Sequence, residues 1–143
     1  MNQRIVLAGG GGFLGGALAK RFVASGCEVI VLTRSPKIRG DGAKEFFWDA
    51  KTLGEWAKFV DGADVVINLT GKSVDCRYNE KNRREIIASR VDSTRAIGAA
   101  IAQAESPPRV WLNASSATIY KHTFDQPHDE SGETGATPEA RDE

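Results

Sequence analysis

Short apolar runs alternate with longer amphipathic stretches along the chain. Five apolar runs predict β-strands, at residues 5–7, 28–32, 45–49, 63–71 and 109–114. The continuous apolar stretch within 63–71 is typical of a strand that is buried on both faces of a parallel sheet. The pattern therefore predicts a parallel sheet.

Helical periodicity occupies the intervals between these runs. Leu14, Leu18 and Phe22 recur at four-residue spacing, with Gly26 placed to end the helix. A short helix is expected at 53–60 and the longest at 80–104, before Pro107 and Pro108. The longest helix carries an apolar stripe at Ile86, Ile87, Val91, Thr94, Ile97 and Ile101. Strand and helix thus alternate as in an α/β fold, a Rossmann-type doubly wound parallel sheet with strand order 3-2-1-4-5.

A glycine-rich turn joins the first strand to the first helix. Glycines at 9, 12 and 15 give the spacing G-x-x-G-x-x-G, and those at 10, 12 and 15 give G-x-G-x-x-G. Glycine lets the backbone approach a pyrophosphate, and the following helix directs its free N–H groups at the anion. Two other interpretations are a structural turn without a ligand and a signal peptide, and six glycines between 9 and 16 count against the second.

Charge and cysteine content narrow the class of protein. The 143 residues carry 19 Lys plus Arg and 19 Asp plus Glu, so the net charge is zero and favours neither nucleic acid nor a membrane surface. No apolar run approaches the length of a membrane span. The two cysteines, Cys27 and Cys76, are expected to be reduced thiols in a cytoplasmic protein. We therefore expect a cytoplasmic protein of one domain over residues 1–120, followed by a polar loop or disordered tail at 121–143.

The end of the second strand predicts which dinucleotide binds. Arg34 lies nineteen residues after Gly15, where a chain that binds NAD carries an acidic residue. A guanidinium suits the 2′-phosphate of NADP, and Lys37 and Arg39 follow closely. This favours NADP over NAD, the alternative being a solvated basic loop. Asp49, at the end of the third strand, suits either an adenine contact or a turn.

Several motifs in order resemble a known family. They are the glycine turn, NLTG at 68–71, SRVDST at 89–94 and SSATIY at 115–120. Together they are similar to the extended and atypical short-chain dehydrogenases/reductases, the NAD-dependent epimerase/dehydratase or sugar-nucleotide epimerase-like group. The resemblance implies cofactor contacts at Gly9, Gly12, Phe13, Leu14, Gly15, Thr33, Arg34, Leu69 and Thr70. It also implies that Glu85 and Arg90 lie near the cofactor.

The same resemblance implies hydride transfer and identifies candidate catalytic residues. Ser116 matches the serine that polarises the substrate, and the family pairs it with Tyr-x-x-x-Lys. Here Tyr78 is followed four residues later by Asn82, and Tyr120 by Phe124, so neither makes the motif. Ser116 and Tyr120 are the catalytic candidates. We expect an incomplete enzyme, the amino-terminal half of an NADP-dependent epimerase or oxidoreductase, with a noncatalytic dinucleotide-binding or sensing module as the alternative.

The remaining patterns concern metals and partners. His122 and His128 lack regular metal-ligand spacing, so no metal site is expected. The substrate is expected to be a small molecule. No amphipathic helix follows the fifth strand to cover it, which predicts a homo-oligomer or a complementing carboxyl-terminal segment.

Overall fold

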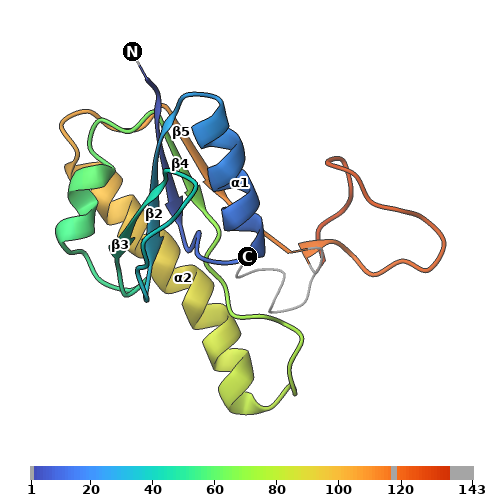
Figure 1. The fold of residues 1–143 in the computed structure, drawn as a ribbon. Helices are drawn as coiled ribbons and strands as arrows, with labels where there is room; N and C mark the ends of the chain where they lie inside the picture. Colours follow the sequence, from blue (N-terminus) through green and yellow to red (C-terminus); the bar gives the residue numbers. More distant parts are fainter. Residues whose placement is uncertain (1, 117–118, 136–143) are drawn as a thin grey trace.

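A computed structural model of the chain describes residues 2–116 and 119–135. Its centre is one five-stranded sheet with the order β3-β2-β1-β4-β5, and every neighbouring pair of strands is parallel (Figure 1). The Rossmann-type strand order predicted from the alternation of elements is therefore confirmed. The strands are β1 (Arg4–Ala8), β2 (Glu28–Thr33), β3 (Lys44–Phe47), β4 (Val65–Asn68) and β5 (Val110–Asn113).

Three helical elements connect the strands. Helix α1 (Phe13–Ala24) follows the glycine turn, η1 (Glu55–Phe59) precedes β4, and α2 (Glu80–Gln103) links β4 to β5. The segment predicted as a short α-helix at 53–60 is a single 3-10 element. In the part of the chain that the structure describes, no helix is both long and apolar enough to cross a membrane.

Two of the predicted strands are shorter than expected because polar groups turn the chain. After β3, Asp49 accepts hydrogen bonds from the backbone N–H groups of Lys51 and Thr52, both at 2.9 Å. After β4, the Asn68 side-chain oxygen accepts from the backbone N–H of Thr70 at 3.1 Å. Strand ladders end where a side chain offers the backbone a competing acceptor. Asp49 thus forms the turn that was one of its two interpretations.

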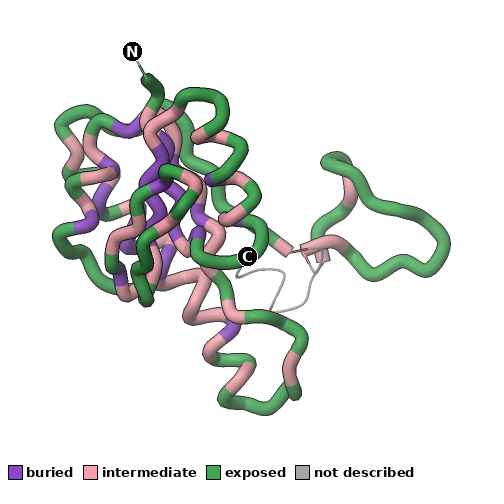
Figure 2. The backbone as a smooth tube through the Cα atoms, viewed as in Figure 1, coloured by how far each residue is buried: buried purple, intermediate pink, exposed green. Residues whose placement is uncertain are grey.

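The core has one layer on each face of the sheet. On one face, Val6, Ile30 and Val66 pack with residues of η1 and α2; on the other, Leu7 and Val31 pack with residues of α1. Successive side chains point to opposite faces, and consecutive residues of β1 and β2 are buried because both faces are covered (Figure 2). These strands supply the rigid frame from which the site is built.

Helix α2 packs on the sheet through a face that differs from the predicted stripe. Its buried residues are Ile86, Ser93, Ala96, Ile97 and Ala100, and most of the predicted stripe is only half-buried. Small side chains let the helix axis approach the sheet closely, so burial here follows size as much as hydrophobicity. Of the predicted stripe, Ile86 and Ile97 are buried and Ile101 packs half-buried against the core, while the buried face also includes Ser93, Ala96 and Ala100.

Strand β5 lies at the edge of the sheet and is exposed along its whole length. Trp111 contacts Gly98 of α2, while Leu112 keeps 52% of its surface exposed. The segment at 119–135 forms a loop that extends away from the sheet, closed by a bridge between Tyr120 and Thr134 (Figure 1). The expectation that the fifth strand leaves apolar surface uncovered agrees with these exposures. The division of the chain at residue 120 stays a prediction.

Candidate dinucleotide site

The glycines of the turn after β1 are required for different physical reasons. Gly9 has φ 71°, and a Cβ there would lie 2.5 Å from Thr70 Oγ1. A Cβ on Gly15 would lie 2.3 Å from the carbonyl oxygen of Gly10, so the fold itself demands glycine at both positions. Gly12, the N-cap of α1, has ordinary extended geometry, and a Cβ there would meet no atom within 4 Å. The protein gives no packing reason for this glycine, which leaves the approach of a ligand as its reason.

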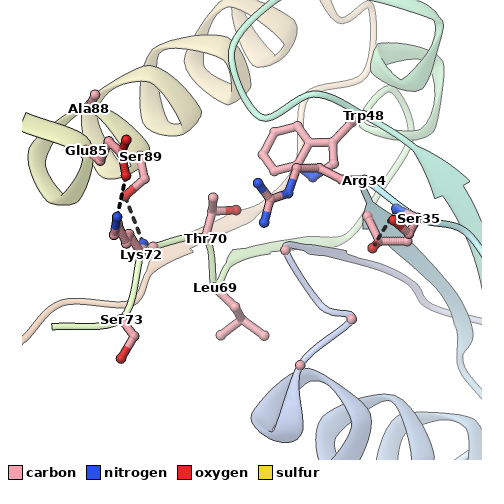
Figure 3. A pocket seen from close by; sticks show the side chains of 15 residues that line it. Arg34, Ser35, Trp48, Leu69, Thr70, Lys72, Ser73, Glu85, Ala88 and Ser89 are labelled. Atoms are coloured by element: carbon pink, nitrogen blue, oxygen red, sulfur yellow. Dashed lines mark hydrogen bonds and ion pairs between the residues drawn. The ribbon is translucent and has the colours of Figure 1, made fainter. Parts of the chain in front are cut away.

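A pocket of about 760 Å³ opens beside this turn, at the carboxyl ends of β1, β2 and β4 (Figure 3). Open parallel sheets bind ligands at this edge, where the strand order reverses. The pocket is lined by seven of the eleven residues predicted to bind the cofactor: Gly9, Gly12, Thr33, Arg34, Leu69, Thr70 and Glu85.

The other four predicted residues lie close to the pocket without lining it. Gly15 is buried against Gly10 beneath the turn. The side chains of Phe13 and Leu14 are 96% and 54% exposed, so contacts to a ligand at the start of α1 would come from their backbone N–H groups. Arg90 donates to the carbonyl oxygens of Ile86 at 3.0 Å and Lys72 at 3.4 Å, and it lines a separate pocket of about 290 Å³.

The basic residues after β2 are not equivalent. Arg39 forms ion pairs with Asp41 and Glu45, at 2.5 and 3.0 Å, and this contact lowers the pKa of Asp41 to about 2. The same two carboxylates raise the pKa of Arg39. Arg34 lines the pocket, is exposed, and has no ion-pair partner among the described residues. Of the two arginines, Arg34 is the one that remains available to an anion.

The turn after β4 contains an unsatisfied polar atom. Thr70 Oγ1 is buried and has no hydrogen-bond partner in the described structure, although Thr70 lines the pocket. Buried hydroxyls are almost always paired, so an unpaired one on a residue that lines a pocket is a candidate partner for a water or a ligand group. This atom and the open space above Gly12 lie on the same pocket, which fits the binding of a dinucleotide.

Asn68 holds this turn in place and is a residue that sequence reasoning missed. It is buried, and its amide N–H₂ donates to Ser93 Oγ at 3.1 Å and Asn113 Oδ1 at 3.0 Å, while its oxygen accepts from the Thr70 backbone. One side chain therefore ties β4, β5 and α2 to the pocket wall. The available signal was a polar residue on the inward side of an otherwise apolar strand.

A second missed residue, Lys72, closes the pocket on the side of α2 (Figure 3). Its ammonium group donates to Asn82 Oδ1 at 2.8 Å and forms an ion pair with Glu85. That contact lowers the pKa of Glu85 further below neutral pH, where the carboxylate is already ionised. Glu85 lines the pocket as expected, but its charge is already engaged by a lysine.

The two catalytic candidates are not part of this pocket. Ser116 follows β5, and the ring of Tyr120 stacks on that of His128 with centroids 5.0 Å apart. Residues 117–118, which connect them, lie outside the described residues. Within residues 2–116 and 119–135, no group of three or more His, Cys, Asp or Glu side chains could hold a metal ion.

A parallel sheet in this order, with a pocket beside a glycine turn at its carboxyl edge, defines a Rossmann-type nucleotide-binding domain. Comparison with known proteins then identifies the family. The family model described as "NAD dependent epimerase/dehydratase family" matches residues 5–142. The chain belongs to this family, as its motifs predicted.

Individual relatives are similar in both sequence and structure. The human epimerase family protein SDR39U1 is 30% identical over 136 residues, 93% of this chain and 43% of its own. The epimerase family protein YfhF of Bacillus subtilis is 30% identical over 92% of this chain and 44% of its own. A crystal structure of human SDR39U1 with NADPH superposes with a TM-score of 0.77 at 29% identity, over 94% of this chain and 44% of that one. The chain thus spans less than half the length of these relatives.

Proposed function

We propose that this chain is the NADP-binding part of an epimerase or oxidoreductase that acts by hydride transfer on a small molecule. The observation that carries the proposal is the pocket in which the open Gly12 position, the unpaired Thr70 hydroxyl and the unpaired Arg34 meet. The NADPH named for the human SDR39U1 structure supports the same cofactor. Sugar nucleotides are the substrate class that the resemblance suggests.

Each part of the pocket would hold a different part of the cofactor. The glycine turn and the free N–H groups at the start of α1 would bind the pyrophosphate. The first turn of α1 carries no acidic residue that would repel it. Arg34 would contact the 2′-phosphate, which is the basis for preferring NADP over NAD. Thr70 Oγ1 would complete its hydrogen bonding on the ligand. When bound, such a cofactor supplies the hydride.

The catalytic assignments rest on the resemblance. Ser116 would polarise the substrate, and Tyr120 is the candidate for proton exchange. The stacking of Tyr120 on His128 favours the second candidate function, a noncatalytic dinucleotide-binding or sensing module, because it engages the phenol ring away from the pocket. We propose a cytoplasmic location for either function, from the reduced cysteines and neutral charge.

Titration calorimetry with NADPH and NADH tests the binding proposal, and an assay of hydride exchange tests the chemistry. NADPH is expected to bind about ten- to a hundredfold more tightly than NADH, since a charge-assisted contact contributes about 1.5 to 3 kcal/mol. Equal affinities would overturn the assignment of Arg34. Substrate turnover with hydride exchange would exclude the noncatalytic alternative, which binding alone cannot do.

A further inference from the structure

The described residues that line the pocket include a carboxylate, that of Glu85, which pairs with the ammonium group of Lys72. Of the described residues that line this pocket, Glu85 is the only acidic one, and Arg34 and Lys72 are the only basic ones. Arg34 and Lys72 lie at opposite sides of the pocket in Figure 3, so the two cations act on different parts of any ligand. The hydrogen bond from the Lys72 ammonium lowers the pKa of Glu85 further below neutral pH, where the carboxylate is already ionised.

Both the backbone and the side chain of Lys72 hold this segment against α2, and the backbone contacts do not involve the ammonium group. The Lys72 N–H donates to Ser89 Oγ at 2.9 Å, and its carbonyl oxygen accepts from Arg90 at 3.4 Å. Two contacts between the turn after β4 and α2 therefore persist when the ammonium group is removed. A substitution of the lysine side chain can thus test its charge while these backbone contacts stay in place.

We propose that Lys72 determines the affinity of the pocket for anionic ligands by neutralising Glu85, and not by contacting the ligand itself. An unpaired carboxylate on the pocket wall would repel a pyrophosphate that binds in the same pocket. The ammonium group pairs with Glu85 and donates to Asn82, so its positive charge offsets the repulsion between Glu85 and the ligand. The inference rests on the proposed dinucleotide function and adds a residue that this function did not include.

The test is a double-mutant cycle on the full chain, with NADPH affinity measured by calorimetry. Lys72→Met is expected to weaken binding about three- to tenfold, and less so at high salt, because it exposes the charge of Glu85. The variant that combines Lys72→Met with Glu85→Gln is expected to return to within about twofold of the wild type. Glu85→Gln alone is expected to bind more tightly than the wild type, because it removes the carboxylate and leaves the charge of Lys72 without its counter-charge. Thermal melts confirm that each variant folds.

Lys81→Met is the matched control. Lys81 also pairs with Glu85, at 3.9 Å, but its side chain is 80% exposed and does not line the pocket. Its substitution is expected to change affinity less than about twofold, because exposed ion pairs contribute little. A comparable loss in both lysine variants would contradict the proposal.

Three results would overturn the inference. No loss in Lys72→Met would show that the lysine has no role in binding. A combined variant as weak as Lys72→Met would show that the lysine contacts the ligand, and a weak Glu85→Gln variant would show that the carboxylate accepts from the ribose. The cycle is repeated with inorganic pyrophosphate, followed by NMR. If pyrophosphate binds and neither NADPH nor NADH does, the proposed function is wrong but the inference about Lys72 can still be tested with pyrophosphate. If none of the three ligands binds, the proposed function and the inference are both wrong.

Discussion

The two ends of the carboxyl edge of the sheet differ in how completely this chain builds them. At the β1–β2–β4 end, Gly9 and Gly15 are fixed by packing and Asn68 ties the neighbouring turn to two other elements. At the β5 end, the strand is exposed on its whole length and Ser116 and Tyr120 do not line the pocket. The described residues thus build a pocket at one end of this edge, and the two catalytic candidates lie outside that pocket.

The chain aligns with less than half of each of these relatives, which bears on the difference between the two ends of the sheet. The chain spans 43% of human SDR39U1 and 44% of YfhF. A nucleotide site needs only one edge of one sheet and the turns on it, whereas hydride transfer also needs groups that hold the substrate and move a proton. If the two ends differ in this way, substitutions at the pocket should change the affinity for a dinucleotide more than substitutions at Ser116 and Tyr120.

Gly12→Val should abolish dinucleotide binding, with a loss of more than about a hundredfold, because a β-branched side chain would fill the space above the turn. The fold should persist, since Gly12 has φ −90° and an added Cβ meets no protein atom. Calorimetry measures the loss. Gly16→Ala is the control, because a Cβ there also meets nothing but lies inside α1. Retained binding in the valine variant would place the cofactor elsewhere.

Arg34→Asp should narrow or invert the preference for NADPH, a change of about ten- to a hundredfold in the ratio of the two affinities. The reason is the loss of the one arginine after β2 that lines the pocket. Lys37→Ala is the control, because Lys37 is exposed and does not line the pocket. If the ratio of the NADPH and NADH affinities is unchanged in Arg34→Asp, then Arg34 does not contact the 2′-phosphate.

The exposed β5 end should make the chain self-associate. Val110, Trp111 and Leu112 are 43%, 37% and 52% exposed, and apolar patches of this kind usually find a partner. Sedimentation should show dimers or larger species, and Leu112→Asp should shift them towards the monomer. A wild-type chain that sediments as a clean monomer would remove the expectation of a homo-oligomer and leave that of a complementing segment.

Ser116→Ala and Tyr120→Phe should leave the affinity for NADPH within about twofold of the wild type. Both residues lie outside the pocket, so substitution there removes no contact to the cofactor. Calorimetry on the two variants measures this, alongside the assay of hydride exchange for the chain itself, which is expected to show no turnover. Loss of NADPH binding in either variant would show that the β5 end belongs to the same binding site as the pocket.

The sequence was sufficient for those features that depend on local pattern. The strand order follows from the alternation of apolar runs and helices, and the glycine turn is recognisable because it lies between a strand and a helix. Arg34 could be predicted because its distance from the turn is set by one helix and one strand. Each of these depends on residues that are close in sequence.

Other features depend on how elements that are far apart in the sequence pack together, so they could not be predicted from local sequence pattern. The network of Asn68 requires the register of β4 against β5 and the rotation of α2, as does the ion pair of Lys72 with Glu85. The stripe of α2 was predicted from hydrophobicity, but the buried residues of the helix also include Ser93, Ala96 and Ala100, which that stripe did not contain. The ends of β3 and β4 were missed because Asp49 and Asn68 accept backbone hydrogen bonds that end the strands.

The most direct test of the central claim is an NMR titration of the isotope-labelled chain with NADPH, followed through the backbone amide signals. The largest shifts are expected at Gly9 to Gly12, at Arg34 and at Leu69 to Gly71, while the signals of the β5 end and of the segment at 119–135 should stay unchanged. Shifts that are largest at β5 or in that segment, with an unchanged glycine turn, would contradict the claim.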